Sequence, residues 1–338
     1  MVRFGIVGFG LHAVRRLMPG FALAKNCQVT ALSRRNQSAA QEAARRYDIG
    51  HVFASTADLC RSKEVDAVLV TTPNSAHLDD VLASVAAGKP VLCEKPMGMS
   101  AAECRRMVEA ARQANVLLGV AHVFRFEESV GRFRERVALG EIGTPAFARS
   151  EFSFMAGPDH GRTWIYDPSI AGGGPLADIG VHCIDSLRYI LQDQVVRVSA
   201  RALSHRQVQE IEVAAALTLE FSRGTLGTVL CSFIADYRTP LELIGDSGTL
   251  RADNCLNVEK PVVLELHRGG ATVETETVSN RLAYALQADA FAAAVEGKAE
   301  FPVPGEEGWQ NQEILDAAYR SIQSGKAEPV PQVNCPRS

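Results

Sequence analysis

The feature that most constrains the fold is a regular alternation of short apolar runs with helix-forming segments over residues 3–120. The apolar runs are RFGIVGF, QVTALS, HVF, AVLVTT, PVLCE and VLLGVAH, and segments such as SAAQEAARRY and SAAECRRMVEAARQAN lie between them. Nearly continuous apolar strands separated by helices are typical of a parallel sheet that helices cover on both faces. The first part of the chain is therefore predicted to be a doubly wound α/β domain.

A glycine-containing turn follows the first run and has the pattern G-x-G-x-x-A, formed by Gly8, Gly10 and Ala13. Two glycines permit a tight turn and a close approach of the backbone to a pyrophosphate, and the start of the next helix offers free N–H groups. The pattern alone is weak evidence, and a turn without a ligand is the alternative. Because it opens an alternating α/β domain, it predicts a dinucleotide site contacted by Gly8, Gly10 and Leu11.

The residues after the second run bear on which dinucleotide is bound. This run ends at Ser33 and continues with Arg34 and Arg35, so the acidic residue that accepts from the ribose hydroxyls of NAD is absent here. A carboxylate would repel a 2′-phosphate, whereas a hydroxyl and a guanidinium bind one. These three residues predict NADP(H) as the preferred cofactor, with NAD(H) as the alternative.

Two later segments, VTTPNSAH and VLCEKPMG, follow the fourth and fifth runs. Ligands of open α/β sheets bind outside the carboxyl ends of the strands, so these segments are expected at the cofactor. The predicted cofactor contacts in them are Thr72, Pro73, Asn74, His77, Glu94 and Lys95.

Lys95 is also a candidate catalytic residue, because it comes directly after an apolar strand on the cofactor side of the sheet. Its amine could donate a proton to a carbonyl oxygen or hold a substrate hydroxyl. A free lysine has a pKa of about 10.4, so this work near neutral pH requires partial burial or a nearby positive charge. A surface lysine in a turn is the alternative, and the bond before Pro96 can be cis or trans.

The segment GGGPLADIGVHCID contains the second group of candidate residues. Asp178 and His182 are four residues apart, so on a helix they share a face, and Asp185 lies on roughly the same side. The glycines at 172–174 are interpreted as leaving space for a substrate or cofactor. Histidine is suited to proton transfer because its ordinary pKa is near neutrality. A structural histidine with a surface aspartate, or a metal site, are the alternatives.

Taken together, GIVGFGLHA, TTPNSAH, EKP, GGGPLADIGVHCID and a late helical region resemble, in order, the glucose–fructose oxidoreductase / inositol dehydrogenase (Gfo/Idh/MocA) family over essentially the whole chain. The resemblance implies a Rossmann domain followed by a mostly antiparallel sheet domain. It also implies that Lys95, Asp178 and His182 meet at the nicotinamide. We therefore expect His182 to accept the hydroxyl proton while Lys95 binds or polarises the same oxygen. Which of the two carries the proton stays open, and Asp178 would bind a neighbouring hydroxyl or orient the lysine.

Some positions depart from the family pattern. Many relatives have an arginine directly after the tryptophan that precedes the glycines, whereas here Ile165 follows Trp164. The missing contact could come from Tyr166 or Arg162, and the predicted substrate-binding residues are Lys95, Trp164, Asp178, His182 and Arg125, the last from the crossover HVFRF. The Ser33–Arg34 pair resembles NADP-using branches of the family, among them the 1,5-anhydrofructose reductases.

The pattern changes from about residue 124 onward, where a helical segment is followed by alternating strands with hairpin signals. The predicted fold class is α/β, with a Rossmann dinucleotide-binding domain at 1–122 and a substrate-binding and oligomerisation α+β domain at 123–338 whose sheet is open and largely antiparallel. The final helices can pack back on the first domain. One face of the second sheet carries apolar positions that are costly to leave in water, which predicts a homodimer or homotetramer through this sheet.

Composition excludes several classes of protein. A formal net charge of −4 over 338 residues gives no basic footprint, so neither nucleic acid nor a membrane surface is an expected partner. The eight cysteines are scattered without a CxxC pair, as in a reduced cytoplasmic protein without a zinc cluster.

The residues together predict an NADP(H)-dependent oxidoreductase that interconverts an alcohol and a carbonyl on a sugar, polyol or related polyhydroxylated molecule. One alternative is a nucleotide-sensing regulator without turnover, but such a protein has no need of Lys95, Asp178 and His182. Another is a glycosidase that oxidises its substrate transiently and regenerates a tightly bound cofactor.

Overall fold

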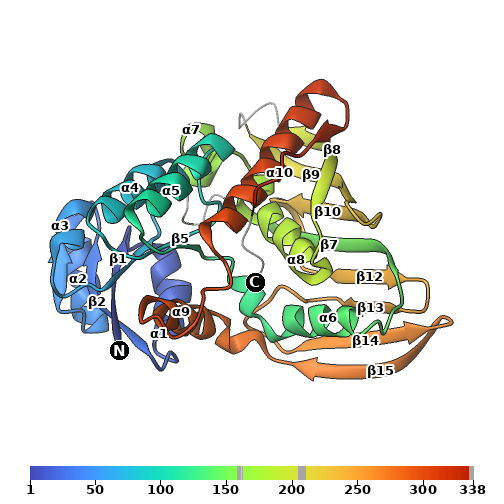
Figure 1. Ribbon diagram of the computed structural model, residues 1–338, viewed down its shortest axis with the longest axis horizontal. Helices are drawn as coiled ribbons and strands as arrows, with labels where there is room; N and C mark the ends of the chain where they lie inside the picture. Colours follow the sequence, from blue (N-terminus) through green and yellow to red (C-terminus); the bar gives the residue numbers. More distant parts are fainter. Residues whose placement is uncertain (158–160, 162, 205–210, 335–338) are drawn as a thin grey trace. The chain divides into compact units, whose positions relative to one another are not determined.

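The computed structural model describes residues 1–157, 161, 163–204 and 211–334 (Figure 1). The contacts between residues divide the chain into two compact units. Unit 1 comprises Met1–Ala121, Tyr284–Gln312 and residues 333–334, and unit 2 comprises His122–Ala283 and Glu313–Gln332.

Unit 1 contains the predicted parallel sheet. Its six strands have the order β3-β2-β1-β4-β5-β6, and every neighbouring pair is parallel. The strands are β1 Val2–Val7, β2 Cys27–Ser33, β3 His51–Phe53, β4 Ala67–Val70, β5 Val91–Cys93 and β6 Leu118–Val120. β1, β4 and β5 are almost completely buried, which is why they read as continuous apolar runs. The prediction of a Rossmann sheet is confirmed.

Helices connect these strands, and local sequence signals set several of their ends. The helical segments are η1 Ala13–Leu17 (a π-turn), α1 Met18–Phe21, α2 Gln37–Tyr47, α3 Thr56–Arg61, η2 Asn74–Ala76, α4 His77–Ala86 and α5 Ala101–Ala114. The side chains of Asn36, Ser55 and Ser100 cap α2, α3 and α5 by accepting a backbone N–H three residues on. Asp48 and Asn115 end α2 and α5 in the left-handed conformation.

Strand order reverses between β1 and β4, whose carboxyl ends are therefore adjacent. Such a switch point is where open α/β sheets bind ligands. The turn after β1 and the segment after β4 both emerge here, and β5 lies next to β4. β2 lies next to β1 on the other side, so the topology brings all four predicted cofactor segments of unit 1 to one edge of the sheet.

A late part of the chain completes the core of unit 1. Phe291, in helix α9 (Ala283–Val295), is fully buried and packs against Phe4 and Phe301 with ring centroids 6.0 and 5.1 Å away. The backbone N–H of Val120 donates to the carbonyl of Val303 at 2.9 Å. The boundaries predicted at 1–122 and 123–338 divide the chain into consecutive pieces, whereas these contacts place 284–312 with the first piece.

Unit 2 is built on a large mixed sheet. Its path is β15-β14-β13-β12-β7-β10-β9-β8-β16, with β11 added beside β7, and only the pair β10–β7 is parallel. The strands are β7 Pro145–Met155, β8 Val195–Ser204, β9 Glu212–Phe221, β10 Leu226–Ser232, β11 Ile234–Arg238, β12 Leu241–Gly245, β13 Thr249–Ala252, β14 Val262–Arg268, β15 Ala271–Val278 and β16 Glu328–Pro329. The largely antiparallel second sheet is as predicted.

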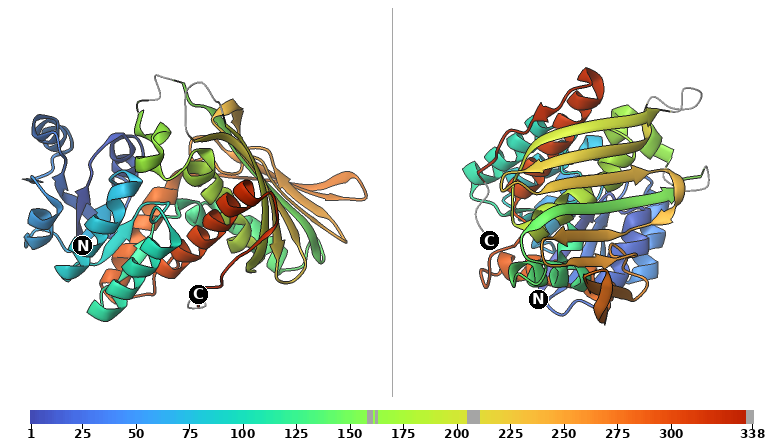
Figure 2. Two further views of the ribbon diagram at one scale, coloured as in Figure 1. Left: turned by 90° about the horizontal axis from the view of Figure 1, so that it is seen from above. Right: turned by 90° about the vertical axis from the view of Figure 1, so that its right-hand side faces the viewer.

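Helices cover only one face of this sheet among the described residues (Figures 1 and 2). They are α6 Glu128–Ala138, the π-turn η6 Leu176–Gly180, α8 Val181–Leu191 and the second half of α10 Gly305–Ser324, with the short η3 Val123–Phe126, η5 Thr163–Tyr166, α7 Pro168–Ala171 and η7 Asn280–Leu282 nearby in the chain. α6 and α8 pack against each other, and α8 packs on β7 and β10. No helix in the described ranges is both long and apolar enough to span a membrane.

Glu127 is an unusual buried acid of unit 2, because neither of its carboxylate oxygens has a hydrogen-bond partner among the described residues. Burial raises the pKa of Glu127 well above its usual range. Folding therefore opposes ionisation of this carboxyl, so stability is full below the unfolded-state pKa of about 4.3 and is lost as pH rises toward the folded-state pKa.

We expect Glu127→Gln to remove this loss, since the amide carries no charge. In urea unfolding between pH 5 and pH 8, the free energy of unfolding of the parent should fall relative to the variant by up to about 1.4 kcal/mol per pH unit. Parallel pH profiles for the two proteins would contradict a buried, unpartnered Glu127.

Candidate active site

The glycine turn after β1 is folded against the ends of β2 and β4. The N–H groups of Gly8 and Phe9 donate to the carbonyl of Ser33 at 3.1 and 3.0 Å, and Gly8 has a φ of +83°. A Cβ at Gly8 would also lie 2.6 Å from the backbone nitrogen of Thr72. Gly8 is therefore required by the backbone conformation and by the close approach of the β4 segment.

Neither the backbone conformation nor a close contact within the protein requires glycine at position 10. Its φ is not in the left-handed region, and an added Cβ would meet only the carbonyl oxygen of Gly8, at an ordinary 3.5 Å. The space beside Gly10 is open, and the neighbouring Leu11 is exposed at the start of the helical segment. Open space next to a helix start is what a pyrophosphate needs, so the residues present fit a dinucleotide.

The end of β2 presents cationic side chains beside this turn. Ser33 is buried as the last residue of β2, Arg34 is partly exposed and Arg35 is exposed. The side-chain amide of Gln37 donates to the carbonyl of Arg34 at 2.8 Å, which fixes the backbone between β2 and α2. No acidic residue stands between Ser33 and Gln37.

The segment after β4 is tied to the glycine turn by Thr71, whose hydroxyl lies 3.0 Å from the carbonyl oxygens of both Val7 and Gly8. Thr72 donates its hydroxyl to Asp80 at 2.8 Å. Pro73 precedes η2, and Asn74 begins it with a buried side chain. Thr72, Pro73 and Asn74 thus border the switch point from the β4 side.

His77 is completely buried, although the sequence predicted it at the cofactor. Its Nδ1 lies 3.0 Å from the carbonyl oxygen of Pro96, and its Nε2 lies 2.8 Å from that of Thr72. The ring therefore joins the β4 segment to the β5 segment, and the cofactor contact predicted for His77 stays a prediction.

Lys95 directly follows β5 and is partly exposed, and the peptide bond between it and Pro96 is cis. The preceding Glu94 is buried and accepts from His12, with 2.9 Å between Oε1 and Nε2. Burial on its own would raise the pKa of Glu94, but His12 and Lys95 outweigh burial and lower it. His12 was not predicted as a site residue; the only signal was its place inside the G-x-G-x-x-A turn.

Asp178 and His182 lie on one continuous helical segment of unit 2, but it is not the uniform α-helix that was expected. Asp178 is in the π-turn η6, and His182 is in the first turn of α8. A π-turn is wider than an α-turn, so residues four apart still lie on nearly the same side. Asp178 is partly exposed, whereas His182 is buried.

Aromatic rings orient His182. Phe124, from η3, stacks on the imidazole with centroids 4.2 Å apart and an interplanar angle of 28°. Phe152, from β7, lies 6.2 Å from the same ring. These contacts join residues far apart in the chain, so no local pattern predicted them.

The backbone conformation and the packing of unit 2 explain the three glycines at 172–174, the GGG loop. Gly172 ends α7 with a φ of +77°, a Cβ at Gly173 would overlap the hydroxyl of Tyr319, and one at Gly174 would overlap the backbone oxygen of Glu212. The interpretation that these glycines leave room for a substrate is therefore wrong: side chains at positions 173 and 174 would collide with other residues of unit 2.

Glu212 also anchors the start of η6. Its Oε1 accepts the N–H groups of Gly174 and Leu176 at 2.9 and 3.1 Å, and the hydroxyl of Tyr319 at 3.0 Å. The buried carboxylate thus holds the loop that leads into the helix of Asp178 and His182.

Arg125 forms a buried ion pair with Asp185. Its Nε and Nη2 lie 2.6 to 3.1 Å from the two carboxylate oxygens, and its guanidinium stands over the ring of Tyr189. Burial opposes ionisation of Asp185, but Arg125 and His122 outweigh it and hold the pKa of Asp185 well below its usual range. Arg125 therefore supports α8, and the substrate contact predicted for it stays a prediction.

Trp164 lies in η5 with a partly exposed side chain. Ile165 is buried, so the position where many relatives carry an arginine points into the core of unit 2 here. The hydroxyl of Tyr166 donates to the carbonyl of Ala156 at 2.5 Å. Arg162 lies outside the described residues. No group of three or more potential metal ligands comes together in the described part of the chain.

Comparison with known proteins agrees with both units. Residues 2–122 match the model of the oxidoreductase family with an NAD-binding Rossmann fold, and residues 130–251 match the GFO/IDH/MocA C-terminal domain. The 1,5-anhydro-D-fructose reductase of Ensifer adhaerens is 30% identical over 98% of this chain and 99% of its own. D-xylose 1-dehydrogenase (NADP(+)) 2 of Haloferax volcanii is 30% identical over 96% of this chain and 98% of its own.

Solved structures have the same fold. The aldose-aldose oxidoreductase of Caulobacter crescentus complexed with glycerol superposes with a TM-score of 0.90 at 24% identity, covering 97% of this chain and 99% of that one. Levoglucosan dehydrogenase complexed with NADH gives a TM-score of 0.87 at 22% identity, covering 98% and 100%. The prediction of an oxidoreductase with an NAD(P)-binding Rossmann fold is confirmed, and the chain belongs to the Gfo/Idh/MocA family of oxidoreductases.

Proposed function

We propose that the protein is an NADP(H)-dependent oxidoreductase that interconverts an alcohol and a carbonyl on a sugar, polyol or related polyhydroxylated molecule. The observation that carries the proposal is the placement of Lys95 at the end of β5, one strand from the switch point where the glycine turn emerges. The names of the two relatives, a sugar reductase and an NADP-dependent sugar dehydrogenase, support the substrate class.

The residues divide the work of the reaction as follows. The nicotinamide, when bound, takes up or gives the hydride. In the oxidative direction the substrate loses its O–H proton while the C–O bond becomes a carbonyl, so the protein must hold the oxygen and remove that proton. We assign binding of the oxygen to Lys95, proton transfer to His182 and Lys95, and a neighbouring hydroxyl to Asp178. The Phe124 stack holds the imidazole of His182 in one orientation for this transfer.

The preference for NADP(H) rests on the cationic end of β2. A charge-assisted hydrogen bond from arginine to phosphate contributes about 1.5–3 kcal/mol, which is about 10- to 100-fold in affinity. We expect the double substitution Arg34→Ala and Arg35→Ala to raise the KM for NADPH by that factor, with little change in the KM for NADH. Steady-state kinetics with both cofactors measure the two KM values. An equal rise in the KM for NADPH and the KM for NADH would contradict 2′-phosphate recognition by these side chains.

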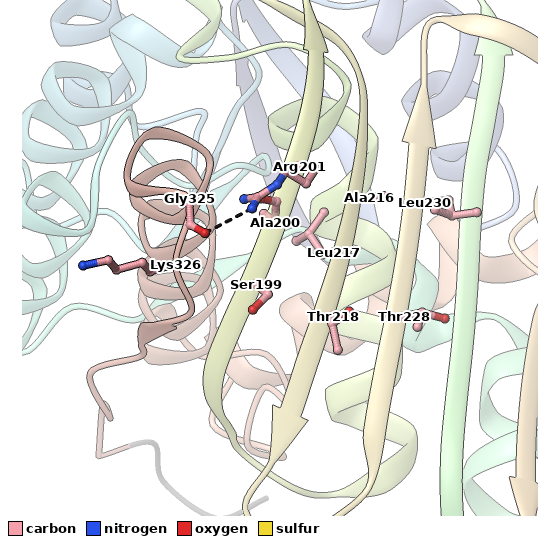
Figure 3. A pocket seen from close by; sticks show the side chains of 10 residues that line it. All are labelled: Ser199, Ala200, Arg201, Ala216, Leu217, Thr218, Thr228, Leu230, Gly325 and Lys326. Atoms are coloured by element: carbon pink, nitrogen blue, oxygen red, sulfur yellow. Dashed lines mark hydrogen bonds between the residues drawn. The ribbon is translucent and has the colours of Figure 1, made fainter.

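The helix-free face of the unit 2 sheet is proposed as the surface that joins two copies of the chain into a homodimer or homotetramer. Exposed Phe147, Leu226 and Leu230 lie on neighbouring strands among charged pairs such as Arg149–Glu242. A hollow of about 420 Å³ lies on the same face over β8–β10, and Ser199, Thr218, Thr228 and Leu230 are among the residues that line it (Figure 3). Apolar side chains of this size are costly to leave in water.

We expect light scattering to give a multiple of 36.5 kDa for the parent. Leu230→Arg should shift the mass toward the monomer, because it would bury a charge in the interface. Leu139→Arg is the control, since Leu139 is exposed at the end of α6. A monomeric parent at micromolar concentration would contradict the proposal.

The function itself is tested by the change in nicotinamide absorbance when the protein is mixed with cofactor and polyhydroxylated substrates. Binding of NADPH without turnover on any of them would instead favour the nucleotide-sensing alternative.

A further inference from the structure

His12 belongs to the dinucleotide turn, but its side chain contacts the segment after β5. Its Nε2 lies 2.9 Å from Oε1 of Glu94, and its ring meets that of Tyr284 edge-on at 6.0 Å. The side chain of His12 is 33% exposed, whereas that of Glu94 is only 11% exposed. The contact joins two segments that are 82 residues apart in the chain.

Glu94 also contacts the backbone of Lys95. While Oε1 faces His12, Oε2 accepts the backbone N–H of Lys95 at 3.2 Å. An ionised carboxylate only accepts hydrogen bonds, and the lowered pKa of Glu94 keeps it ionised, so Nε2 of His12 is the donor. Each oxygen of this buried group therefore has a donor, and loss of either would leave an unsatisfied buried charge.

The other side of Lys95 is held independently. The carbonyl of Pro96 faces Nδ1 of His77 at 3.0 Å. The backbone on both sides of Lys95 is thus fastened through a histidine, one fully buried and one at the cofactor turn. Of the two, only His12 lies in the turn that would receive the pyrophosphate.

We propose that His12 is a positioning residue: by donating a hydrogen bond to Glu94, it fixes the backbone of Lys95 against the dinucleotide turn. The inference rests on the proposed function, in which Lys95 acts on the substrate oxygen. A displacement of about 1 Å at a reacting group can cost about 100-fold in rate, so a residue that only holds Lys95 in place can have a large kinetic effect.

Two amide variants of His12 distinguish the positioning of Lys95 from a direct contact with the cofactor. In His12→Gln the side-chain NH₂ group can occupy the place of Nε2 and still donate to Glu94, whereas in His12→Asn it is one methylene too short. We expect His12→Asn to lower kcat by about 10- to 100-fold while the KM values for NADPH and for the sugar change less than about threefold. His12→Gln should stay within about threefold of the parent in kcat.

A second readout uses the protein without cofactor. Hydrogen exchange of the peptide that contains Lys95 should be faster in His12→Asn than in the parent and unchanged in His12→Gln, because the carboxylate that accepts the Lys95 N–H is no longer held. Exchange in α5 should be the same in all three proteins, which separates a local effect from general destabilisation.

Four outcomes would overturn the inference. Parent-like kcat and exchange in His12→Asn would show that the hydrogen bond does not position Lys95. A rise in the KM for NADPH in both variants with kcat retained would make His12 a direct cofactor contact. Normal turnover in Lys95→Ala would overturn the proposed function as well, whereas an inactive Lys95→Ala beside a fully active His12→Asn would overturn the role of His12 alone.

Discussion

Lys95→Ala is expected to lower kcat/KM by about 10²- to 10⁴-fold, the range over which general acid–base groups contribute. Lys95 directly follows β5, the strand next to β4 at the switch point, and alanine in its place can neither donate a proton nor hold a substrate oxygen. Binding of NADPH should change much less, because the glycine turn and the cationic end of β2 remain intact. Steady-state kinetics and a fluorescence titration with NADPH measure the two quantities.

Lys63→Ala is the matched control for Lys95→Ala, since Lys63 is an exposed lysine of the same unit that lies on a loop before β4. Its kinetics should equal those of the parent. Parent-like kcat/KM in Lys95→Ala on a true substrate would show that Lys95 takes no part in the reaction.

The second large effect concerns stability. Arg125→Met is expected to lower the free energy of unfolding at pH 7 by about 3–5 kcal/mol, because it leaves the carboxylate of Asp185 buried without its main partner. The side chains of the pair are only 5% and 1% exposed. The double variant Arg125→Met, Asp185→Leu should recover much of the loss, since no unpaired charge then remains.

Urea unfolding of the single and double variants provides the measurement. Arg105→Met is the control, because Arg105 pairs with Glu109 on the exposed face of α5 and such pairs contribute at most about 1 kcal/mol. Since the pKa of Asp185 is depressed, its stabilising contribution is present above the unfolded-state value of about 3.9 and is lost as pH falls through the folded-state value. The difference in the free energy of unfolding between the parent and Arg125→Met should therefore become smaller at acidic pH. A loss below 1 kcal/mol at pH 7 would contradict a structural role for the pair.

The fold of unit 1 could be predicted from the sequence better than that of unit 2, for a physical reason. Parallel strands buried on both faces must be apolar throughout, so β1, β4 and β5 appear as uninterrupted runs. The glycine turn could be placed because it follows the first of these runs directly. Ser33, Arg34 and Arg35 could be located in the same way, from the end of the second run.

The packing around the site could not be predicted, because its partners are far apart in the chain. The stack of Phe124 on His182 joins residues 58 positions apart, and the hydrogen bond between Tyr319 and Glu212 spans 107. Hydrophobic periodicity reports which side of an element is buried, not which residue covers it. For this reason the GGG loop was interpreted as space for a ligand, when Glu212 and Tyr319 occupy that space.

One further difference has the same origin. The π-turn that holds Asp178 changes the hydrogen-bond register without changing the sequence pattern of a helix, so a continuous α-helix was expected there. The sequence allowed the final helices to pack back on the first domain; in the structure residues 284–312 belong to unit 1, where Phe291 and Phe301 fill a core built 170 or more residues earlier in the chain. Local propensity carries no information about which residues begin and end such a return.

The most direct test of the central claim is the absorbance of the nicotinamide at equilibrium and over time. The purified protein is mixed with NADPH or NADP and, separately, with NADH or NAD, against a panel of aldoses, inositols, dicarbonyl sugars and aromatic diols in both directions. The proposed function predicts turnover of at least one polyhydroxylated compound, faster with NADP(H) than with NAD(H), and its loss in Lys95→Ala. Tight NADPH binding with no absorbance change on any compound, or turnover that survives in Lys95→Ala, would contradict it.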